Sequence, residues 1–597
     1  MTNNTIAERL SALREGMAKQ KIDAYIVTNY DPHTSEYSAS HWLAREWISG
    51  FTGSVGTAVV VPNGGGLWTD GRYFIQAEEQ LRGSGLDLFK AKLVETPTIP
   101  QWLADTLPNK ARVGVDGRSI SQEFYLELKQ SFLSKGIEIV LEHDLISPIW
   151  HNRPPRPSTK VFNHTTQYAG ISTSDKIRKL REYLSEQDSQ ALLISTLDDV
   201  MWTLNIRGGD TDYSPVSEAY LLVSQNHCRL FINSDKISAE VSDELLKHGV
   251  HLHQYEHVHE ALNLIENHSK VIYNAKNTDS LLVNNVKNEI NLTNLPCIVT
   301  QLKAIKNPIE LRNMKEALRH DGIAMVKFMH WLQQQVPSGK VTELSAEQYL
   351  IALRKQRPGY VSDSFRTIAG FGKHGAKMHY AANENSNSTI NESEFFLVDS
   401  GGQFLRGTTD VTRTFHFGSP NDTQCRDYTL VLKAVIRLTQ TRFLKGSTGS
   451  NLDIMARGVL WQYGIDYKCG TGHGVGMCLN VHEGPQNFSQ NPAEVALVPG
   501  MVITNEPGIY REGEYGIRIE NIMQVVEVEE NEFGTFYGFE TITLAPIATN
   551  MLKVDMLSSD ELDWLNDYHQ QCMNFLAEDL NTEEKTWLQQ ATQPISQ

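Results

Sequence analysis

The chain has 597 residues and a mass of 67.3 kDa, which suggests roughly four domains, or three with a large one. Apolar residues make up 40% of the chain and charged residues 21%, and this composition excludes collagen-like, disordered and membrane-spanning proteins. The excess of acidic over basic residues leaves a net charge of −17, which repels phosphate backbones and anionic lipid, so we expect neither a nucleic-acid nor a membrane partner.

The six cysteines are scattered and include no CxxC pair, a pattern typical of reduced thiols in a large intracellular chain. The N-terminal residues lack the apolar core of a signal peptide, and no apolar run reaches the length of a membrane span. We therefore expect a cytoplasmic protein.

Residues 1–157 are predicted to form an α/β unit followed by a linker. The spacing of apolar residues predicts a helix over 6–17, a short buried strand over 24–27 and a hairpin over 57–68. Four prolines between 148 and 157 disfavour regular structure, so this stretch is predicted to be the linker.

A helix followed by a short apolar strand recurs after the linker, in a second unit predicted over 158–306. The helix is predicted at 177–184, the strand at 191–194, and a further pair of strands at 219–223 and 229–232. The two units match only in pattern and spacing. A duplicated α/β unit and a chance likeness of generic helix–strand patterns therefore both remain open.

A third domain is predicted over 307–597. The motif at 307–310 is a helix start, with Asn as the cap, Pro in the first helical position and Glu three residues after the cap. From Phe395 onward the pattern becomes that of antiparallel strands with glycine-containing turns. Ser558 and Glu561 form a second capping box ahead of an amphipathic helix.

Four acidic residues in or beside the apolar strands of this domain are the main chemical signal. Asp399 ends one strand and Asp410 starts the return strand after a predicted turn, so the two acids are expected to face each other across a hairpin. Glu506 and Glu520 flank a second predicted hairpin, and His473 lies in a glycine-rich stretch between the two hairpins. A buried carboxylate is costly unless it is paired or bound to a metal.

These five side chains supply enough ligands for two adjacent divalent cations, and such hard ligands favour Mn²⁺ over thiolate-binding metals. Two cations about 3.5–4 Å apart can acidify a bridging water and stabilise a tetrahedral intermediate, so hydrolysis of an amide or ester is the predicted chemistry. Each residue taken alone is more often a turn residue, a loop acid or a structural histidine. The prediction therefore depends on their combination.

The same series of five residues resembles the dinuclear site of the pita-bread family of metallopeptidases. The sequences GTGHGVG, NVHEGP, NEPGIY, GIRIEN and VDSGGQ resemble more specifically the cytosolic, three-domain Xaa-Pro aminopeptidases of that family. SGFTGSVGTA and WTDGRYF resemble the first domain of those enzymes, so the resemblance covers nearly the whole chain. It implies two creatinase-N-like α/β domains followed by a C-terminal pita-bread domain with a helical extension.

The resemblance implies that five residues hold two divalent cations, and Mn²⁺ is the expected metal. Asp399 would bind one cation, His473 and Glu506 the other, and Asp410 and Glu520 would bridge both. The attacking group would be a hydroxide that bridges the two metals. Glu506 would accept the proton of the water that forms this hydroxide, because a metal ligand lies within hydrogen-bond reach of it.

The resemblance also implies substrate contacts. His379, in GAKMHY, and His482 would flank the scissile bond and donate hydrogen bonds to the substrate carbonyl. Tyr510 and Arg518 would shape the substrate site, and Arg72 of the first unit would lie near the substrate. Taken alone, His379 is more often a buried structural histidine and Arg72 half of an ordinary hairpin ion pair.

The activity implied is removal of the N-terminal residue from peptides with proline in the second position. An X-Pro bond has no amide hydrogen, so an enzyme that needs no such donor and offers an apolar slot for the ring can select it. Two alternatives remain open: a prolidase limited to X-Pro dipeptides, and a catalytically inactive pita-bread module that binds a partner. Two-domain prolidases are shorter, and an inactive module is expected to lose ligands.

Two further positions bear on the resemblance. Cys469, four residues before His473, stands where the animal cytosolic enzymes have another histidine, so no role of that histidine transfers to this chain. Trp461 matches a position that the animal enzyme uses at its dimer contact, so the resemblance implies a homodimer.

Overall fold

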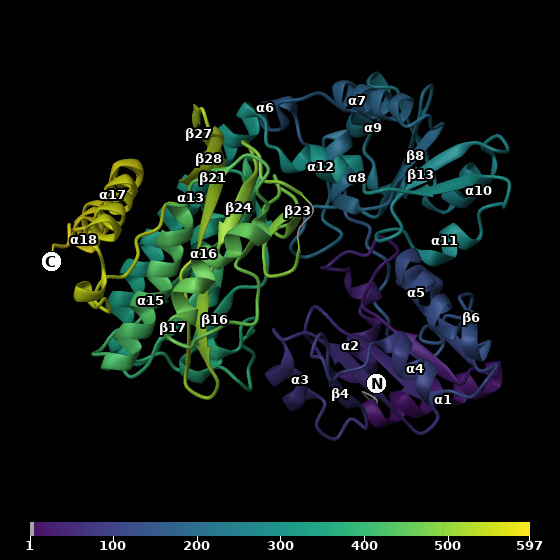
Figure 1. Cartoon of the computed structure of the whole chain (residues 1–597), viewed down its shortest axis with the longest axis horizontal. Helices are drawn as coiled ribbons and strands as arrows, with labels where there is room; N and C mark the ends of the chain where they lie inside the picture. The colour runs from purple at the N-terminus through teal and green to yellow at the C-terminus, as the bar shows by residue number, and fades with distance from the viewer. Residues whose placement is uncertain (1–4, 493–494, 597) are drawn as a thin grey trace. The chain divides into compact units, whose positions relative to one another are not determined.

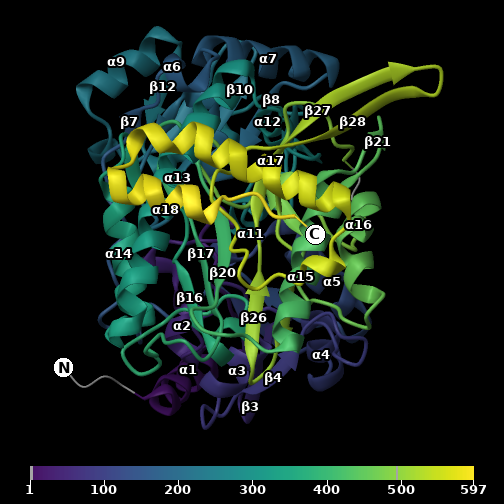
Figure 2. The ribbon, with the colours of Figure 1, turned by 90° about the vertical axis from the view of Figure 1, so that its left-hand side faces the viewer.

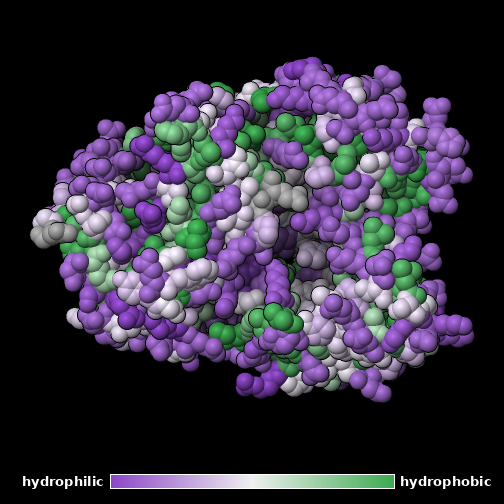
Figure 3. Space-filling model, in the orientation of Figure 1, coloured by the Kyte–Doolittle hydropathy of each residue, from purple (hydrophilic) through white to green (hydrophobic). Residues whose placement is uncertain are grey.

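The structure is a computed structural model that describes residues 5–492 and 495–596. Among these residues, no helix is both long and apolar enough to cross a bilayer. The face shown in Figure 3 is mostly hydrophilic, with apolar residues in small separate groups. The chain divides into two units (Figure 1): the first is the chain up to Asn163 with Ile171–Asp212 and Val216–Val299, and the second is the chain from Thr300 with His164–Gly170 and Tyr213–Pro215.

The first unit contains the same α/β fold twice. Each copy has a six-stranded sheet, with the order β4-β3-β2-β1-β5-β6 in the first copy and β12-β11-β10-β8-β13-β14 in the second. At every step the two sheets also agree in whether neighbouring strands are parallel or antiparallel. The interpretation as a duplicated unit is therefore confirmed, and the chance likeness is excluded.

The elements of the first copy are α1 (Ile6–Gln20), β1 (Ala24–Val27), α2 (Ala44–Ser49), β2 (Thr57–Val61), β3 (Gly64–Thr69), α3 (Phe74–Gln80), β4 (Asp87–Lys90), α4 (Ile99–Thr106), β5 (Arg112–Val115), α5 (Gln122–Phe132) and β6 (Glu138–Val140). Those of the second copy are α7 (Thr173–Glu186), β8 (Ala191–Ile194), α8 (Leu197–Leu204), β10 (Ala219–Ser224), β11 (Cys228–Ile232), α9 (Ala239–Lys247), β12 (Val250–His253), α10 (Val258–Asn263), β13 (Lys270–Tyr273), α11 (Ser280–Asn284) and β14 (Asn291–Asn294). The predicted helices, strands and hairpin of both copies are present.

The central strand β1 is a continuous apolar run because both faces of its sheet are covered. Tyr25 packs in a cluster with Leu13 of α1, whereas its neighbour Ile26 packs in another cluster with Leu128 of α5. Successive side chains of a strand point to opposite faces, so α1 and α5 cover opposite faces of the sheet.

The second unit consists of antiparallel sheets and long helices, and antiparallel strands are what the residue pattern from Phe395 onward predicted. Its strands form the sheets β15-β18-β19, β16-β17-β20, β21-β28-β27-β24-β22-β23 and β25-β26. The strands are β15 (Tyr360–Asp363), β16 (Ile368–Phe371), β17 (Phe396–Ser400), β18 (Gly402–Phe404), β19 (Gly407–Thr408), β20 (Val411–Phe415), β21 (Phe443–Leu444), β22 (Gly472–Gly474), β23 (Glu483–Phe488), β24 (Val502–Asn505), β25 (Gly508–Arg511), β26 (Tyr515–Arg518), β27 (Asn521–Asn531) and β28 (Gly534–Thr541). The main helices are α13 (Pro308–Gln335), α14 (Glu343–Lys355), α15 (Asp422–Thr439), α16 (Gly449–Trp461), α17 (Ser559–Leu576) and α18 (Thr582–Ala591).

Both predicted capping boxes of this unit are present. The Asn307 side chain accepts hydrogen bonds from the backbone of Ile309 and Glu310, and the Glu310 carboxylate accepts one from the backbone of Asn307. Ser558 and Glu561 start α17 in the same way. The C-terminal helices α17 and α18 pack against α13 (Figure 2).

The connection between Asp399 and Asp410 differs from the prediction. The segment predicted as a turn forms β18 and β19, which belong to a separate sheet in which β18 pairs with β15 on one side and with β19 on the other. Asp399 is paired with Thr412 rather than with Asp410. The glycines there serve close backbone packing: a Cβ on Gly401 would lie 1.9 Å from the Thr409 carbonyl oxygen. Glycine composition alone does not distinguish a turn from such a close approach.

We expect Leu13→Ala to lower the free energy of unfolding of the first unit by about 2–5 kcal/mol, because the side chain is fully buried beneath the first sheet. Leu133→Ala removes the same atoms from a side chain that is 64% exposed and should change stability by less than about 0.5 kcal/mol. Urea unfolding of both variants, followed by circular dichroism, measures the difference. Equal losses would contradict the assignment of the buried face of α1.

Candidate metal centre

The five candidate ligands all belong to the second unit, and each lies within or directly beside a strand. The sheet architecture therefore fixes their backbone positions. Asp399 is in β17, Asp410 precedes β20, His473 is in β22, Glu506 follows β24 and Glu520 precedes β27.

Four of these side chains are linked by short distances. Asp410, His473 and Glu520 each offer a ligand atom, and these atoms lie within 4.8 Å of one another. The Nε2 atom of His473 is 3.5 Å from Asp410 Oδ2 and 3.5 Å from Glu506 Oε1. His473 Nδ1 lies 2.9 Å from the Gly474 carbonyl oxygen, to which it donates, so Nε2 is the nitrogen left to bind a metal.

Asp399 joins this group through Arg518. The buried guanidinium donates to Asp399 Oδ2 and, over 3.1 Å, to Thr412 Oγ1. The Thr412 hydroxyl in turn donates to Glu520 Oε2 over 2.7 Å, and Arg518 Nη1 donates to the Tyr510 hydroxyl over 2.6 Å. One arginine therefore fixes two of the candidate ligands, one of them through a threonine.

The carboxylates repel one another strongly. Burial, and then the charges of neighbouring carboxylates, raise the pKa of Asp410 and of Glu520 well above the usual range. The Oδ1 atoms of Asp399 and Asp410 are buried and, within residues 5–492 and 495–596, have no hydrogen-bond partner. Buried oxygen acceptors without donors, gathered around one histidine, fit divalent cations as the missing positive charge.

His482 lies beside this cluster. Its ring meets that of His473 edge-on, with the ring centroids 4.4 Å apart. The next residue, Glu483, is buried and forms an ion pair with Lys306, and its other oxygen lies 3.4 Å from Lys303 Nζ. This pair of lysines fixes the start of β23 and thereby the backbone that carries His482.

His379 is half-buried in the segment that follows the short 3₁₀ helix η7 (Gly372–Ala376). This helix lies directly against β26: a Cβ on Gly516 would be 1.8 Å from the Gly375 carbonyl oxygen. Only glycine allows this approach, and β26 is the strand that ends at Arg518. The chain around His379 is thus packed onto a strand of the candidate site.

Arg72 belongs to the first unit. Its guanidinium makes two hydrogen bonds to the Asp70 carboxylate, at 3.0 Å and 2.8 Å, and lies 5.5 Å from the centroid of the Tyr73 ring. These contacts are those of a local ion pair in the turn between β3 and α3, and they assign no substrate contact.

Two buried arginines that support the site were not predicted from the sequence. Arg413 of β20 donates to the backbone carbonyls of Thr412 and Glu520, at 2.7 Å and 2.6 Å, and to Asn521 Oδ1. It also donates to the hydroxyl of Tyr568, on α17, over 2.8 Å. The available signal was an arginine inside an otherwise uncharged strand, where a charge is costly without several acceptors.

The second is Arg457 of α16, which is 1% exposed at its side chain. It binds Asp453 on its own helix and donates to Asp466 Oδ1 and to the carbonyl oxygens of Tyr467 and Cys469. Cys469 therefore lies in a segment held by α16, a few residues before the candidate ligand in β22.

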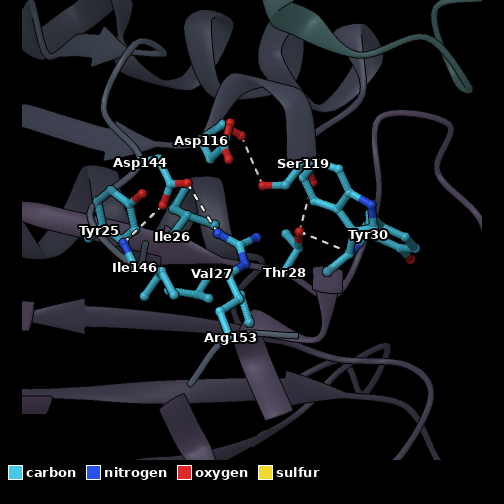
Figure 4. A pocket seen from close by; sticks show the side chains of 12 residues that line it. Tyr25, Ile26, Val27, Thr28, Tyr30, Asp116, Ser119, Asp144, Ile146 and Arg153 are labelled. Atoms are coloured by element: carbon cyan, nitrogen blue, oxygen red, sulfur yellow. Dashed lines mark hydrogen bonds and ion pairs between the residues drawn. The ribbon is translucent and has the colours of Figure 1, made fainter. Parts of the chain in front are cut away.

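A small pocket in the first unit is a weaker candidate (Figure 4). It is partly open to solvent and lies where β1 and β5 end. Its polar groups bond one another: Arg153 lies 3.3 Å from Asp144, and the Thr28 hydroxyl donates to the Ser119 carbonyl. Paired groups of this kind do not indicate a ligand, unlike the carboxylate cluster.

Comparison with protein families matches the whole architecture. A model of metallopeptidase family M24 matches residues 312–527, and a model of the C-terminal region of that peptidase matches residues 535–595. Two models of the creatinase/prolidase N-terminal domain match residues 9–146 and 152–310, which contain the two α/β copies.

Individual relatives align over almost the full chain. Aminopeptidase P2 of Arabidopsis thaliana is 37% identical, in an alignment that covers 100% of this chain and 89% of the relative. A probable Xaa-Pro aminopeptidase P of Neurospora crassa is 38% identical, in an alignment that covers 100% of this chain and 90% of the relative. The solved structure of a Caenorhabditis elegans X-prolyl aminopeptidase, described as a cytosolic enzyme with a di-nuclear active site, matches with a TM-score of 0.95 and 34% identity, over 99% of this chain and 100% of its own.

We expect the metal-free protein to lose stability as the pH rises above the ordinary carboxyl range. The raised pKa values of Asp410 and Glu520 mean that their protonated forms contribute stability at low pH, and this contribution is lost as the pH rises through each raised pKa. Divalent cations should restore the stability and release protons on binding.

Melting temperatures measured against pH, with chelator and with added Mn²⁺, check this expectation. The Asp410→Asn variant should show a smaller loss with pH and a smaller gain from the metal. A wild-type protein whose melting temperature is insensitive to Mn²⁺ at every pH would contradict the assignment of the centre.

Proposed function

This chain belongs to metallopeptidase family M24, and we propose that it is an Xaa-Pro aminopeptidase, which releases the N-terminal residue from peptides with proline in the second position. The observation that carries the proposal is the cluster of buried carboxylates around His473, with two oxygen atoms left without donors. All five ligand positions are filled, which argues against a catalytically inactive binding module. Relatives named Xaa-Pro aminopeptidase P align with the full chain.

We propose that the centre holds two divalent cations, and that these are Mn²⁺. The all-oxygen and imidazole donor set favours such a metal over thiolate-binding ones. When bound, the cations supply the Lewis acidity that activates water for attack on the peptide carbonyl. The ligand assignment is Asp399 for one cation, His473 and Glu506 for the other, and Asp410 and Glu520 for both.

The side chains beside the ligands have distinct proposed tasks. Glu506 is 19% exposed at its side chain and so is open to substrate and water, which suits it to accept a proton. His482, whose ring lies against that of His473, and His379 donate hydrogen bonds to the substrate carbonyl as negative charge develops there.

Arg518 and Tyr510 lie beside the carboxylates, where Arg518 donates to Asp399 and to the Tyr510 hydroxyl. Hydrogen bonds to Asp399, Thr412 and Tyr510 occupy all three nitrogens of the guanidinium, which favours shaping of the site over direct binding of a peptide. The oxygen atoms of the carboxylate ligands can accept hydrogen bonds from the free N-terminal amine of a peptide, and this favours removal of a terminal residue over internal cleavage. Arg72 remains a proposed substrate contact from the first unit.

We infer three domains, with bounds at 1–157, 158–306 and 307–597. Support comes from the duplicated sheet order in the first two segments and from the capped start of α13.

A cytoplasmic location and a homodimer are further proposals. The former is supported by a structural relative described as cytosolic, and the latter by a tryptophan at the end of α16 that is 46% exposed.

We expect the purified protein to release arginine from Arg-Pro-Pro, to lose this activity on chelation and to regain it with Mn²⁺. Arg-Ala-Pro is the control peptide and should be cleaved much more slowly. Asp410→Asn should lower kcat/KM by more than about 100-fold, since loss of an outer partner of a metal ligand alone costs 10–100-fold. Mass spectrometry of the products and metal analysis by plasma emission give the measurements.

The two alternatives predict different products. A prolidase would cleave the dipeptide Arg-Pro and leave the tripeptide intact, and a binding module would cleave neither peptide at any metal concentration. Either result would overturn the proposed activity.

We expect Trp461→Glu to convert a dimer into a monomer, because a charge would enter an interface that buries this exposed ring. Phe575→Glu places the same charge on another exposed aromatic residue, 56% exposed, and should leave the dimer intact. Light scattering coupled to size exclusion measures the mass of each. A wild-type protein that is monomeric at micromolar concentration would contradict the proposal.

A further inference from the structure

Glu343 is the first residue of α14, and its carboxylate is fully buried. The carboxylate contacts the segment 371–388, which contains His379. The carboxylate is a hydrogen-bond acceptor shared by groups on both sides of that histidine. Oε1 accepts from Phe371 N and His374 Nδ1, each at 2.8 Å, and Oε2 accepts from Tyr380 OH at 2.9 Å and Ser388 N at 2.8 Å.

These four bonds use both carboxylate oxygens evenly. Because a carboxylate only accepts, His374 donates to it from Nδ1. The Tyr380 hydroxyl lies 2.9 Å from Glu343 Oε2 and also 2.8 Å and 2.9 Å from the carbonyl and hydroxyl oxygens of Ser386, so Glu343 shares this donor with Ser386. The rings of His374 and Tyr380 are stacked, with centroids 4.5 Å apart. His374 and Tyr380, which both bond to Glu343, thus lie five residues before and one residue after His379.

The start of α14 is attached to the far end of the segment by other bonds as well. Glu343 N donates to the Ser388 carbonyl, Ile390 N donates to the Val341 carbonyl, and Leu344 N donates to Asn387 Oδ1. These bonds do not involve the carboxylate. The carboxylate of Glu343 adds bonds to Phe371 and His374 before His379 and to Tyr380 directly after it.

We propose that Glu343 is a positioning residue for His379: it fixes the chain on both sides of this histidine so that the imidazole stays within hydrogen-bond reach of the substrate carbonyl. The inference rests on the proposed aminopeptidase activity. It concerns transition-state stabilisation rather than metal binding, because Glu343 lies outside the candidate ligand set. A displacement of about 1 Å at a group that acts on the transition state costs about 100-fold in rate.

The test is Glu343→Gln in the full chain loaded with Mn²⁺. Glutamine keeps the size of the side chain but turns one acceptor oxygen into a donor, so two of the four bonds are lost. We expect kcat for Arg-Pro-Pro to fall by about 10–100-fold, with KM changed less than about 3-fold and with two metal ions still bound. Glu310→Gln is the matched control, since it neutralises another buried acid in the first turn of a helix, and it should retain kcat.

A double-mutant cycle separates positioning from a general structural effect. If Glu343 acts through His379, the double variant Glu343→Gln/His379→Ala should be no slower than His379→Ala alone. Tyr380→Phe removes one of the four bonds, together with the contacts of the hydroxyl to Ser386, and keeps the stacked ring. It should therefore lower kcat by a smaller factor and be equally silent in the His379→Ala background. This variant gives the same answer if Glu343→Gln does not fold.

Unchanged kcat in both Glu343→Gln and Tyr380→Phe, or losses that multiply with that of His379→Ala, would overturn the inference while leaving the aminopeptidase activity standing. Failure of the wild-type protein to cleave any Xaa-Pro peptide would instead overturn the proposed function. The two failures are thus distinguished by the wild-type assay.

Discussion

The repulsion between buried carboxylates is the constraint on which the second unit depends. Asp399, Asp410 and Glu520 are almost fully enclosed, and burial together with mutual repulsion raises the pKa of the last two. A cluster of buried carboxylates is tolerated only if nearby positive charge offsets the repulsion and a rigid backbone holds the carboxylates in place. Arg518 provides part of that charge, Arg413 holds the backbone next to Glu520, and the proposed divalent cations would supply the rest of the positive charge.

Local signals were enough to predict much of the fold. Helix caps, short apolar runs and the hairpin between Glu506 and Glu520 depend on neighbours in sequence, and the structure contains them. The strand β18 escaped prediction because it pairs with β15, which lies about 40 residues earlier in the chain, and β19 joins the sheet by pairing with β18. This region also anchors the loop before His482, since Gln403 donates to the Leu479 carbonyl.

The types of the candidate ligands could be inferred from sequence, but the way they are held could not. Carboxylates in apolar strands point to metal because a buried charge needs a partner. The partners of Asp399 and Glu343 come from segments that are distant or unremarkable in sequence, so no pattern of spacing reveals them. The equivalence of the two α/β copies likewise became visible only in the order and direction of paired strands.

The contact between Arg413 and Tyr568 changes how the limits of the catalytic module should be drawn. The family match for the peptidase ends at residue 527, yet a tyrosine some forty residues later supports the arginine that holds the backbone of a candidate ligand. A fragment cut at that limit would expose the buried guanidinium and strip α13 of its cover. The C-terminal extension is therefore part of the minimal folding unit, and affinity tags or fusions belong beyond α18 rather than in its place.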